Sequence, residues 1–258
     1  MTAQGLVAVR RGPRYWFDGY VAMLRYELTG LRTFLAFVLL IQVFMSAGMT
    51  YFYGFYMGEL PTSAQLFLIT GTPALALFPI GFVIVPNAIG QQKLAGNYDF
   101  AQSLPVPGVA ATAAAFTVYT VVALPGVAIA LIVAAFRYDV GFVIAWSIVP
   151  AVLLVSIMAI SVGFALGHGV ADPRVTNLIT NILVFAVLLF TPIVVPIDQF
   201  PGWLASMHHA LPFYHMAQIL RAALSDGLVT GVATSYAVLI VWTAGSWALA
   251  TWSLSRQR

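Results

Sequence analysis

The chain has 258 residues, of which 61% are hydrophobic and 7% are charged, and its mean hydropathy is +0.95. Because about a quarter of the residues of a soluble domain are charged, this composition excludes soluble enzymes and soluble binding modules. The net charge of +3 comes from basic residues spread over several loops, which argues against a nucleic-acid partner. The absence of cysteine excludes disulfides, thiolate metal sites and cysteine nucleophiles.

Residues 14–32 are predicted to form an amphipathic helix. Apolar residues recur there at spacings of three and four, and charged residues follow a neighbouring stripe. Such a helix lies at the membrane interface, where it either only anchors the chain or also braces a partner protein. The side chains assigned to this interface are Arg14, Trp16, Arg25 and Arg32.

Six apolar segments follow, each long enough to cross a bilayer core of about 30 Å as a helix. None shows the period-two alternation of a strand, and a helix satisfies its own backbone polar groups in hydrocarbon. We therefore expect an all-α integral membrane protein that forms a single domain over residues 1–258. The predicted spans are residues 33–54, 63–88, 109–135, 141–166, 176–195 and 231–254.

The distribution of basic residues predicts the orientation of these spans. An even number of spans places both termini on the same side, and Lys and Arg are enriched on the cytoplasmic side. If the termini are cytoplasmic, all of the 11 Lys and Arg residues except Arg137 and Arg221 are cytoplasmic as well. The expected location is the cell membrane, with both termini in the cytoplasm.

A polar, glycine-containing segment lies between the second and third spans, on the predicted cytoplasmic side. We expect a short helix over about residues 91–104, closed by a proline-rich turn at residues 104–108. Such a helix can dock onto another protein and pass its movement to both adjacent spans. Tyr98 and Phe100 are the expected anchors, because buried aromatic residues dominate interface energies. The full predicted docking set is Leu94, Gly96, Tyr98, Asp99 and Phe100.

The segment between the fifth and sixth spans, residues 198–222, is too apolar for a solvated loop and too broken for a span. Two short helices that dip into the outer leaflet and return would fit, with proline and glycine at their turns. They would close the external end of a pathway. The residues assigned to this external gate are Phe200, Pro201, Trp203, Pro212, Tyr214 and Arg221.

No motif predicts catalysis or metal binding. The chain lacks a glycine-rich phosphate loop, so ATP would have to be hydrolysed by another subunit. His208, His209 and His215 do not have the spacing of metal ligands; we interpret them as interfacial side chains, and an intramembrane enzyme using them is a minor alternative. His168 and Asp172 are expected to be solvated in a short cytoplasmic turn.

Ionisable groups are also scarce within the predicted spans. All acidic residues fall in loops, near span ends or in the interfacial helix, whereas an ion-coupled carrier normally has carboxylates near the bilayer centre. The spans do contain polar residues, which either line a pathway or join helices by hydrogen bonds. Those assigned to a pathway are Gln42, Ser156, Asn177 and Asn181.

Two segments resemble the membrane-spanning subunit of type-two ABC exporters, a family that includes bacterial drug, polyketide and polysaccharide exporters. The cytoplasmic segment is similar to the coupling-helix region of that family, although Gln91 and Gln92 stand where a glutamate is common. The external segment is similar to a second family pattern and is the more specific of the two. The matching residues are Lys93-Leu94-Ala95-Gly96-Asn97-Tyr98-Asp99, Ser103-Leu104-Pro105-Val106-Pro107, Phe200-Pro201-Gly202-Trp203-Leu204, Leu211-Pro212-Phe213-Tyr214 and Arg221.

The resemblance implies an elbow helix at residues 14–32, six spans, a coupling helix, and re-entrant helices at residues 198–222. It also implies a complex of two permeases, identical or homologous, with two ATPase subunits that bind ATP and Mg²⁺. The chain itself would then bind no cofactor and would not be an enzyme. The lack of charge within the spans favours a hydrophobic or amphipathic substrate, such as a drug-like molecule or a lipid, with a lipid-linked polysaccharide as an alternative. An ion-coupled carrier or channel is the alternative from another class.

Overall fold

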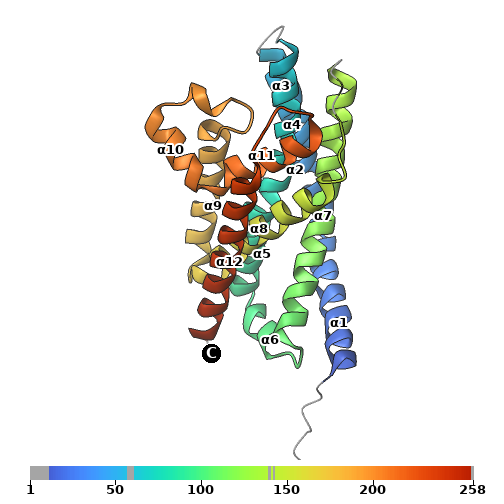
Figure 1. Cartoon of the computed structure of the whole chain (residues 1–258). Helices are drawn as coiled ribbons and strands as arrows, with labels where there is room; N and C mark the ends of the chain where they lie inside the picture. Colours follow the sequence, from blue (N-terminus) through green and yellow to red (C-terminus); the bar gives the residue numbers. More distant parts are fainter. Residues whose placement is uncertain (1–11, 57–60, 139–140, 142, 257–258) are drawn as a thin grey trace, which may run out of the picture.

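Helices make up the regular structure of the protein. The structure is a computed structural model that describes residues 12–56, 61–138, 141 and 143–256. Within these residues there is no strand, and the long helices run side by side (Figure 1). Five helices are long and apolar enough to cross a membrane, and a bent pair near the amino terminus is a sixth candidate. The protein is therefore an all-α, multi-pass membrane protein, as the sequence predicted.

The amino-terminal part of the bundle is a series of four helical segments. These are α1 (Pro13–Arg32), α2 (Leu35–Val43), the π-helix η1 (Phe44–Gly48) and α3 (Met49–Tyr56). α1 and α2 meet at an angle of 70°. The predicted first span, residues 33–54, is thus interrupted by a turn at its start and by a π-helical segment in its middle, where one extra residue per turn changes the hydrogen-bonding pattern.

The amphipathic helix α1 packs along another helix of the same chain, α7 (Gly108–Arg137). Gly19 lies against the side chains of Pro107 and Val106, so the two backbones approach closely. The hydroxyl of Tyr20 donates a hydrogen bond of 3.0 Å to Oγ1 of Thr117. The apolar stripe that the sequence shows is therefore covered in part by protein.

One long, nearly continuous helical run forms the centre of the molecule. It consists of α4 (Thr62–Pro79), the π-helix η2 (Ile80–Ile84) and α5 (Val85–Leu94), and most of it is buried. The π-helical segment directly follows Pro79, whose ring displaces the preceding turn and which donates no backbone hydrogen bond. Gly81 and Gly163 bring this run against α8 (Ile148–Gly169); a Cβ at either glycine would overlap backbone atoms of the neighbouring helix.

Two later spans have different bounds from those predicted. α8 begins at Ile148 rather than at 141, because the N–H groups of Val143 and Ala145 donate to the last carbonyls of α11 (Pro212–Leu224) instead. α9 (Pro173–Phe190) ends before the predicted 195, because Pro192 restricts Thr191 to an extended conformation. The last span, α12 (Ala233–Arg256), packs mainly against α8.

The connecting helices lie at opposite ends of the bundle (Figure 1). At one end is α6 (Asn97–Ser103), together with the start of α1 and the end of α12. At the other end are the 3-10 turn η3 (Ile197–Gln199), α10 (Gly202–Ala210) and α11. Residues 198–222 thus contain two short helices, and Phe213 of α11 packs against Phe78 and Phe82 of the central run.

Candidate functional site

A two-residue turn, Ala95-Gly96, separates the short helix α6 from α5. Gly96 has a left-handed conformation with φ of 70°, which a residue without a Cβ adopts readily. The predicted helix over 91–104 is therefore two pieces: residues 91–94 continue α5, and α6 begins at Asn97. After Ser103 the chain becomes extended at Leu104 and enters α7 through Pro105 and Pro107.

Lys93 joins the end of α5 to the end of α8. Its ammonium group donates hydrogen bonds of 2.7 Å to the carbonyl of Gly167 and 2.8 Å to the carbonyl of Val170. The last carbonyls of a helix have no partner within the helix and carry partial negative charge. Lys93 therefore caps α8 with a positive charge, and its ammonium group also lies 5.2 Å from the ring centroid of Tyr98.

Tyr98 and His168 form a second link between α6 and α8. The Tyr98 hydroxyl and Nδ1 of His168 share a hydrogen bond of 2.7 Å, and the imidazole stacks on the ring of Phe164. The backbone carbonyl of His168 accepts a further bond of 2.9 Å from Ser253 of α12. The expectation that His168 is solvated is wrong, because its ring is packed between two aromatic side chains.

The predicted docking residues divide into an inner and an outer set. Tyr98 is only 8% exposed and points into the protein, so it is not available as a surface anchor in this conformation. Leu94 and Phe100 are 61% and 60% exposed, and Gly96 and Asp99 are exposed beside them. We call the outer set the α6 surface; it consists of Leu94, Gly96, Asp99 and Phe100.

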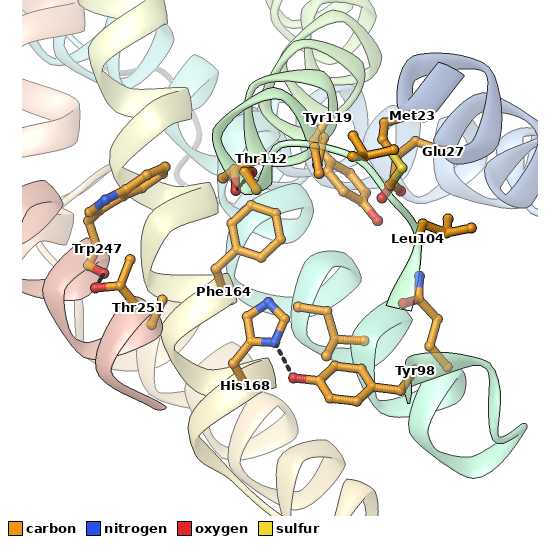
Figure 2. A pocket seen from close by; sticks show the side chains of 17 residues that line it. Met23, Glu27, Tyr98, Leu104, Thr112, Tyr119, Phe164, His168, Trp247 and Thr251 are labelled. Atoms are coloured by element: carbon orange, nitrogen blue, oxygen red, sulfur yellow. Dashed lines mark hydrogen bonds between the residues drawn. The ribbon is translucent and has the colours of Figure 1, made fainter. Parts of the chain in front are cut away.

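A partly open cavity, which we call the inner pocket, lies behind α6 (Figure 2). It holds about 200 Å³ and is bounded by α1, α6, the first turns of α7, and the ends of α8 and α12. Aromatic rings form much of its wall, and among the residues that the structure describes Glu27 is the one carboxylate that lines it. Its labelled lining residues are Met23, Glu27, Tyr98, Leu104, Thr112, Tyr119, Phe164, His168, Trp247 and Thr251.

A larger depression, which we call the lateral groove, adjoins the inner pocket. It holds about 670 Å³ between α1, α2 and the α4–α5 run. The two cavities have Glu27, Gln92 and Tyr119 in common. Beyond these shared residues the groove is mostly apolar, with Phe34 and Phe37 in its wall.

The four residues assigned to a pathway lie in different environments. Gln42 is fully buried and donates a 2.7 Å hydrogen bond to the carbonyl of Val122, so it joins α2 to α7. Ser156 is also buried. Asn177 and Asn181 are instead exposed on α9, where their amides bond to each other and to Asn87 of α5.

The elbow residues Arg14, Trp16, Arg25 and Arg32 are all exposed on α1. Trp16 stacks on Tyr20 with 5.5 Å between ring centroids. The outer surface of α1 is therefore polar and aromatic, while the opposite side packs on α7. Both features are typical of a helix at a membrane interface.

Arg221, predicted as an external gate residue, is completely buried. Its Nη2 donates to the carbonyls of Ile193 and Phe67, at 2.6 Å and 3.3 Å, and its guanidinium lies 3.5 Å from the ring centroid of Phe67. It thus fastens α11 to α4 and to the segment after α9. Of the other gate residues, Pro201 and Trp203 are exposed, Phe200 and Tyr214 are half-buried, and Pro212 is buried.

The histidines of α10 and α11 also make internal contacts. Nε2 of His208 lies 2.7 Å from the carbonyl of Phe190, and the His215 ring bonds to Ser235 and to the carbonyl of His209. Burial lowers the pKa of both His208 and His215. In the part of the chain that the structure describes, no three His, Cys, Asp or Glu residues gather as metal ligands.

Sequence reasoning missed the role of Glu27, although a signal was present. Gly19, Met23 and Leu31 are the buried residues of α1, and Glu27 continues their spacing of four. A carboxylate within the apolar stripe of an amphipathic helix indicates an inward-facing charge. The contact of Tyr98 with His168, 70 positions away, has no comparable local signal.

The comparison with protein families places the chain. Residues 20–225 match the family described as ABC-2 type transporter. This range begins within α1 and ends just after α11, so it includes α6, the residues that line the lateral groove, and the helices α10 and α11, whereas α12, which lines part of the inner pocket, lies beyond it. None of the curated proteins with which the chain was compared matches it. The chain therefore belongs to the ABC-2 type transporter family, as a membrane-spanning permease subunit.

Proposed function

We propose that this permease forms the transmembrane pathway of an ATP-driven exporter, with ATP and Mg²⁺ bound by a separate ATPase subunit. The observation that carries the proposal is the structure around α6. Its outer side exposes Leu94 and Phe100, while its inner side is bonded to α8 through Tyr98. A partner that pushes on the α6 surface would therefore move the end of α8 and, through Ser253, the end of α12.

The energetic requirement for such coupling is a difference between two states. A ligand that binds two conformations equally shifts no equilibrium, however tightly it binds. ATP-driven closure of the ATPase must then favour one arrangement of α6 over another. The hydrogen bond from Tyr98 of α6 to His168 of α8, and the bond from Ser253 of α12 to the carbonyl of the same histidine, support this role. Through these two bonds, movement of α6 would reach both spans.

The exposed face of α9 supports pairing with a second permease, identical or homologous. Only 17% of α9 is buried within the chain, and Asn177 and Asn181 are exposed on this helix. Their amides bond to each other and to Asn87 within the chain, and a polar surface of this kind is less unfavourable against a second permease than against hydrocarbon. We therefore propose a complex of two permeases and two ATPases, with α6 and both termini in the cytoplasm.

A hydrophobic or amphipathic molecule, drug-like or lipid, is the proposed substrate. The lateral groove supports this class, because most of its wall surface is apolar while Glu27 and several amide side chains supply a smaller polar part. Export rather than import is supported by the resemblance of residues 93–107 and 200–221 to exporters. A lipid-linked polysaccharide is the alternative substrate within the same family.

Gentle purification of the tagged permease from its native membranes tests the proposal. We expect an ATPase subunit to co-purify in stoichiometric amount and its hydrolysis of ATP to be stimulated by substrate. Phe100→Ala, with or without Leu94→Ala, is expected to release the ATPase, because these side chains supply the apolar part of the α6 surface. Phe136→Ala is the matched control, since Phe136 is 88% exposed at the opposite end of α7.

Two results would contradict the proposal. One is a permease that purifies alone under conditions that preserve other complexes of this family. The other is transport that continues after ATP depletion and stops when ion gradients are dissipated, which would indicate an ion-coupled carrier. Release of the ATPase by Phe136→Ala as strongly as by Phe100→Ala would contradict the assignment of the docking surface alone.

A further inference from the structure

We propose that the inner pocket is a binding site for a lipophilic organic cation, with the carboxylate of Glu27 as the counter-charge. This makes such a cation the substrate class of the exporter, a step that rests on the function proposed above. The binding site itself does not depend on that function.

The carboxylate of Glu27 is partly removed from water without compensation. The side chain is half-buried, and no described residue gives it a hydrogen bond or an ion pair. Taking a charged group out of water is unfavourable unless it gains a partner. Burial accordingly raises the pKa of the Glu27 carboxyl to about 7, and a bound cation would favour its charged form.

The walls of the pocket suit a cation better than an anion. Figure 2 shows the rings of Tyr119, Phe164 and Tyr98 around the same space as Glu27. The faces of aromatic rings carry negative electrostatic potential and attract ammonium groups. An anion of the same size would meet both these faces and the Glu27 carboxylate.

No other charged side chain lines the pocket among the described residues. The groups that face Glu27 are the hydroxyls of Tyr119 on α7 and Tyr98 on α6, and the imidazole of His168 on α8. Lys93 is not part of the wall, because its ammonium group is bonded to the carbonyls at the end of α8. Glu27 is therefore the charged side chain that a ligand in the pocket would meet among the described residues.

The adjoining lateral groove explains why the cation should be lipophilic. The inner pocket holds about 200 Å³, less than the roughly 300–1,000 Å³ of sites for drug-sized ligands. Because Glu27 and Tyr119 line both cavities, a molecule can place its cationic head in the pocket and its tail in the groove. A short alkyl chain on a quaternary ammonium group has this shape.

Equilibrium binding of radiolabelled hexyltrimethylammonium tests the proposal. The full-length permease is placed in nanodiscs of phosphatidylcholine, whose zwitterionic surface does not attract cations, and empty nanodiscs give the background. We expect saturable binding, an affinity at least tenfold weaker in Glu27→Gln, and no competition by hexylsulfonate. Binding to the wild type should weaken as the pH falls, because protons compete for the carboxylate, and this dependence should vanish in Glu27→Gln.

Asp18→Asn is the matched control, because it removes the same charge from an exposed position of the same helix and should leave binding unchanged. Glu27→Asp should retain part of the affinity, which separates loss of charge from loss of folding. The proposal is overturned if the wild type shows no saturable binding, if Glu27→Gln binds as the wild type does, or if the sulfonate competes equally. Since the assay contains no ATP, a permease that binds the cation but has no ATPase partner would refute only the proposed exporter function.

Discussion

Removal of the Tyr98 hydroxyl separates transmission through α6 from docking onto α6. Tyr98→Phe deletes one oxygen atom and keeps the ring, which is 8% exposed and packed inside the protein. The lost contact is the 2.7 Å hydrogen bond to Nδ1 of His168. The α6 surface around Phe100 is unchanged by this substitution, so ATPase binding should persist.

The magnitude follows from the environment of the bond. A hydrogen bond of this kind contributes about 0.5–1.5 kcal/mol, and leaving a buried partner unsatisfied costs about 1–3 kcal/mol; because this bond is only partly buried, the lower part of the second range applies. If the bond is present in one transport state and absent in the other, the equilibrium between the two states shifts by about 1–1.4 kcal/mol, or roughly five- to tenfold. If it is present in both, the substitution lowers stability without changing transport.

The assay compares three quantities for the purified complex: the amount of ATPase retained, the rate of ATP hydrolysis, and the substrate transported per ATP in proteoliposomes. For Tyr98→Phe we expect full retention of the ATPase and a several-fold fall in transport per ATP. For Phe100→Ala we expect loss of the ATPase. The reasoning is refuted if Tyr98→Phe releases the ATPase while Phe100→Ala retains it, because Tyr98 and not Phe100 would then be the anchor, although the sequence predicted both.

Three further predictions concern stability and can be measured by thermal unfolding of the purified protein. Lys93→Met should destabilise the fold by about 1–2 kcal/mol, since α8 loses its positively charged cap in a half-exposed site. Gly163→Ala should cost about 1–3 kcal/mol, because the added methyl group overlaps the backbone of Gly81. Acidification below about pH 6.5, the pKa of a histidine in the unfolded chain, should destabilise α10 and α11. Burial lowers the pKa of His215 in the folded protein, so the unfolded chain takes up a proton at a higher pH than the folded one.

Each of these predictions has a control within the chain. Arg25→Gln removes an exposed charge from α1 and should change stability by less than about 0.5 kcal/mol. Gly245→Ala places a methyl group on α12 where nothing lies within 4 Å, so it should be neutral or slightly stabilising. His215→Asn should reduce the loss of stability between pH 7.5 and 5.5. A result in which control and test variants behave alike would contradict the packing or the protonation argument concerned.

The fold class was predictable because it depends on local information. An apolar run of about 20 residues is a span whatever its neighbours are. The break at Gly96 and the end of α9 before Pro192, which our predicted bounds did not include, also reflect backbone preferences of single residues. The side of α6 that faces inward was not predictable, since it depends on the position of α8. The burial of Arg221 was likewise not predictable. The positive-inside rule assigns a basic residue to one side of the membrane from its place in the sequence, whereas the burial of Arg221 depends on Phe67 and Ile193, which are distant in the sequence.

The arrangement of α9 bears on whether the inner pocket stays open in a complex. No residue of α9 lines the inner pocket or the lateral groove. A second permease seated on the exposed face of α9 would cover Asn177 and Asn181 without filling either cavity. Binding at Glu27 and pairing through α9 are therefore compatible. Movement of α6 would reach the pocket directly, because Tyr98 and His168 form part of its wall, and a change in their contact would alter the space available to the cation.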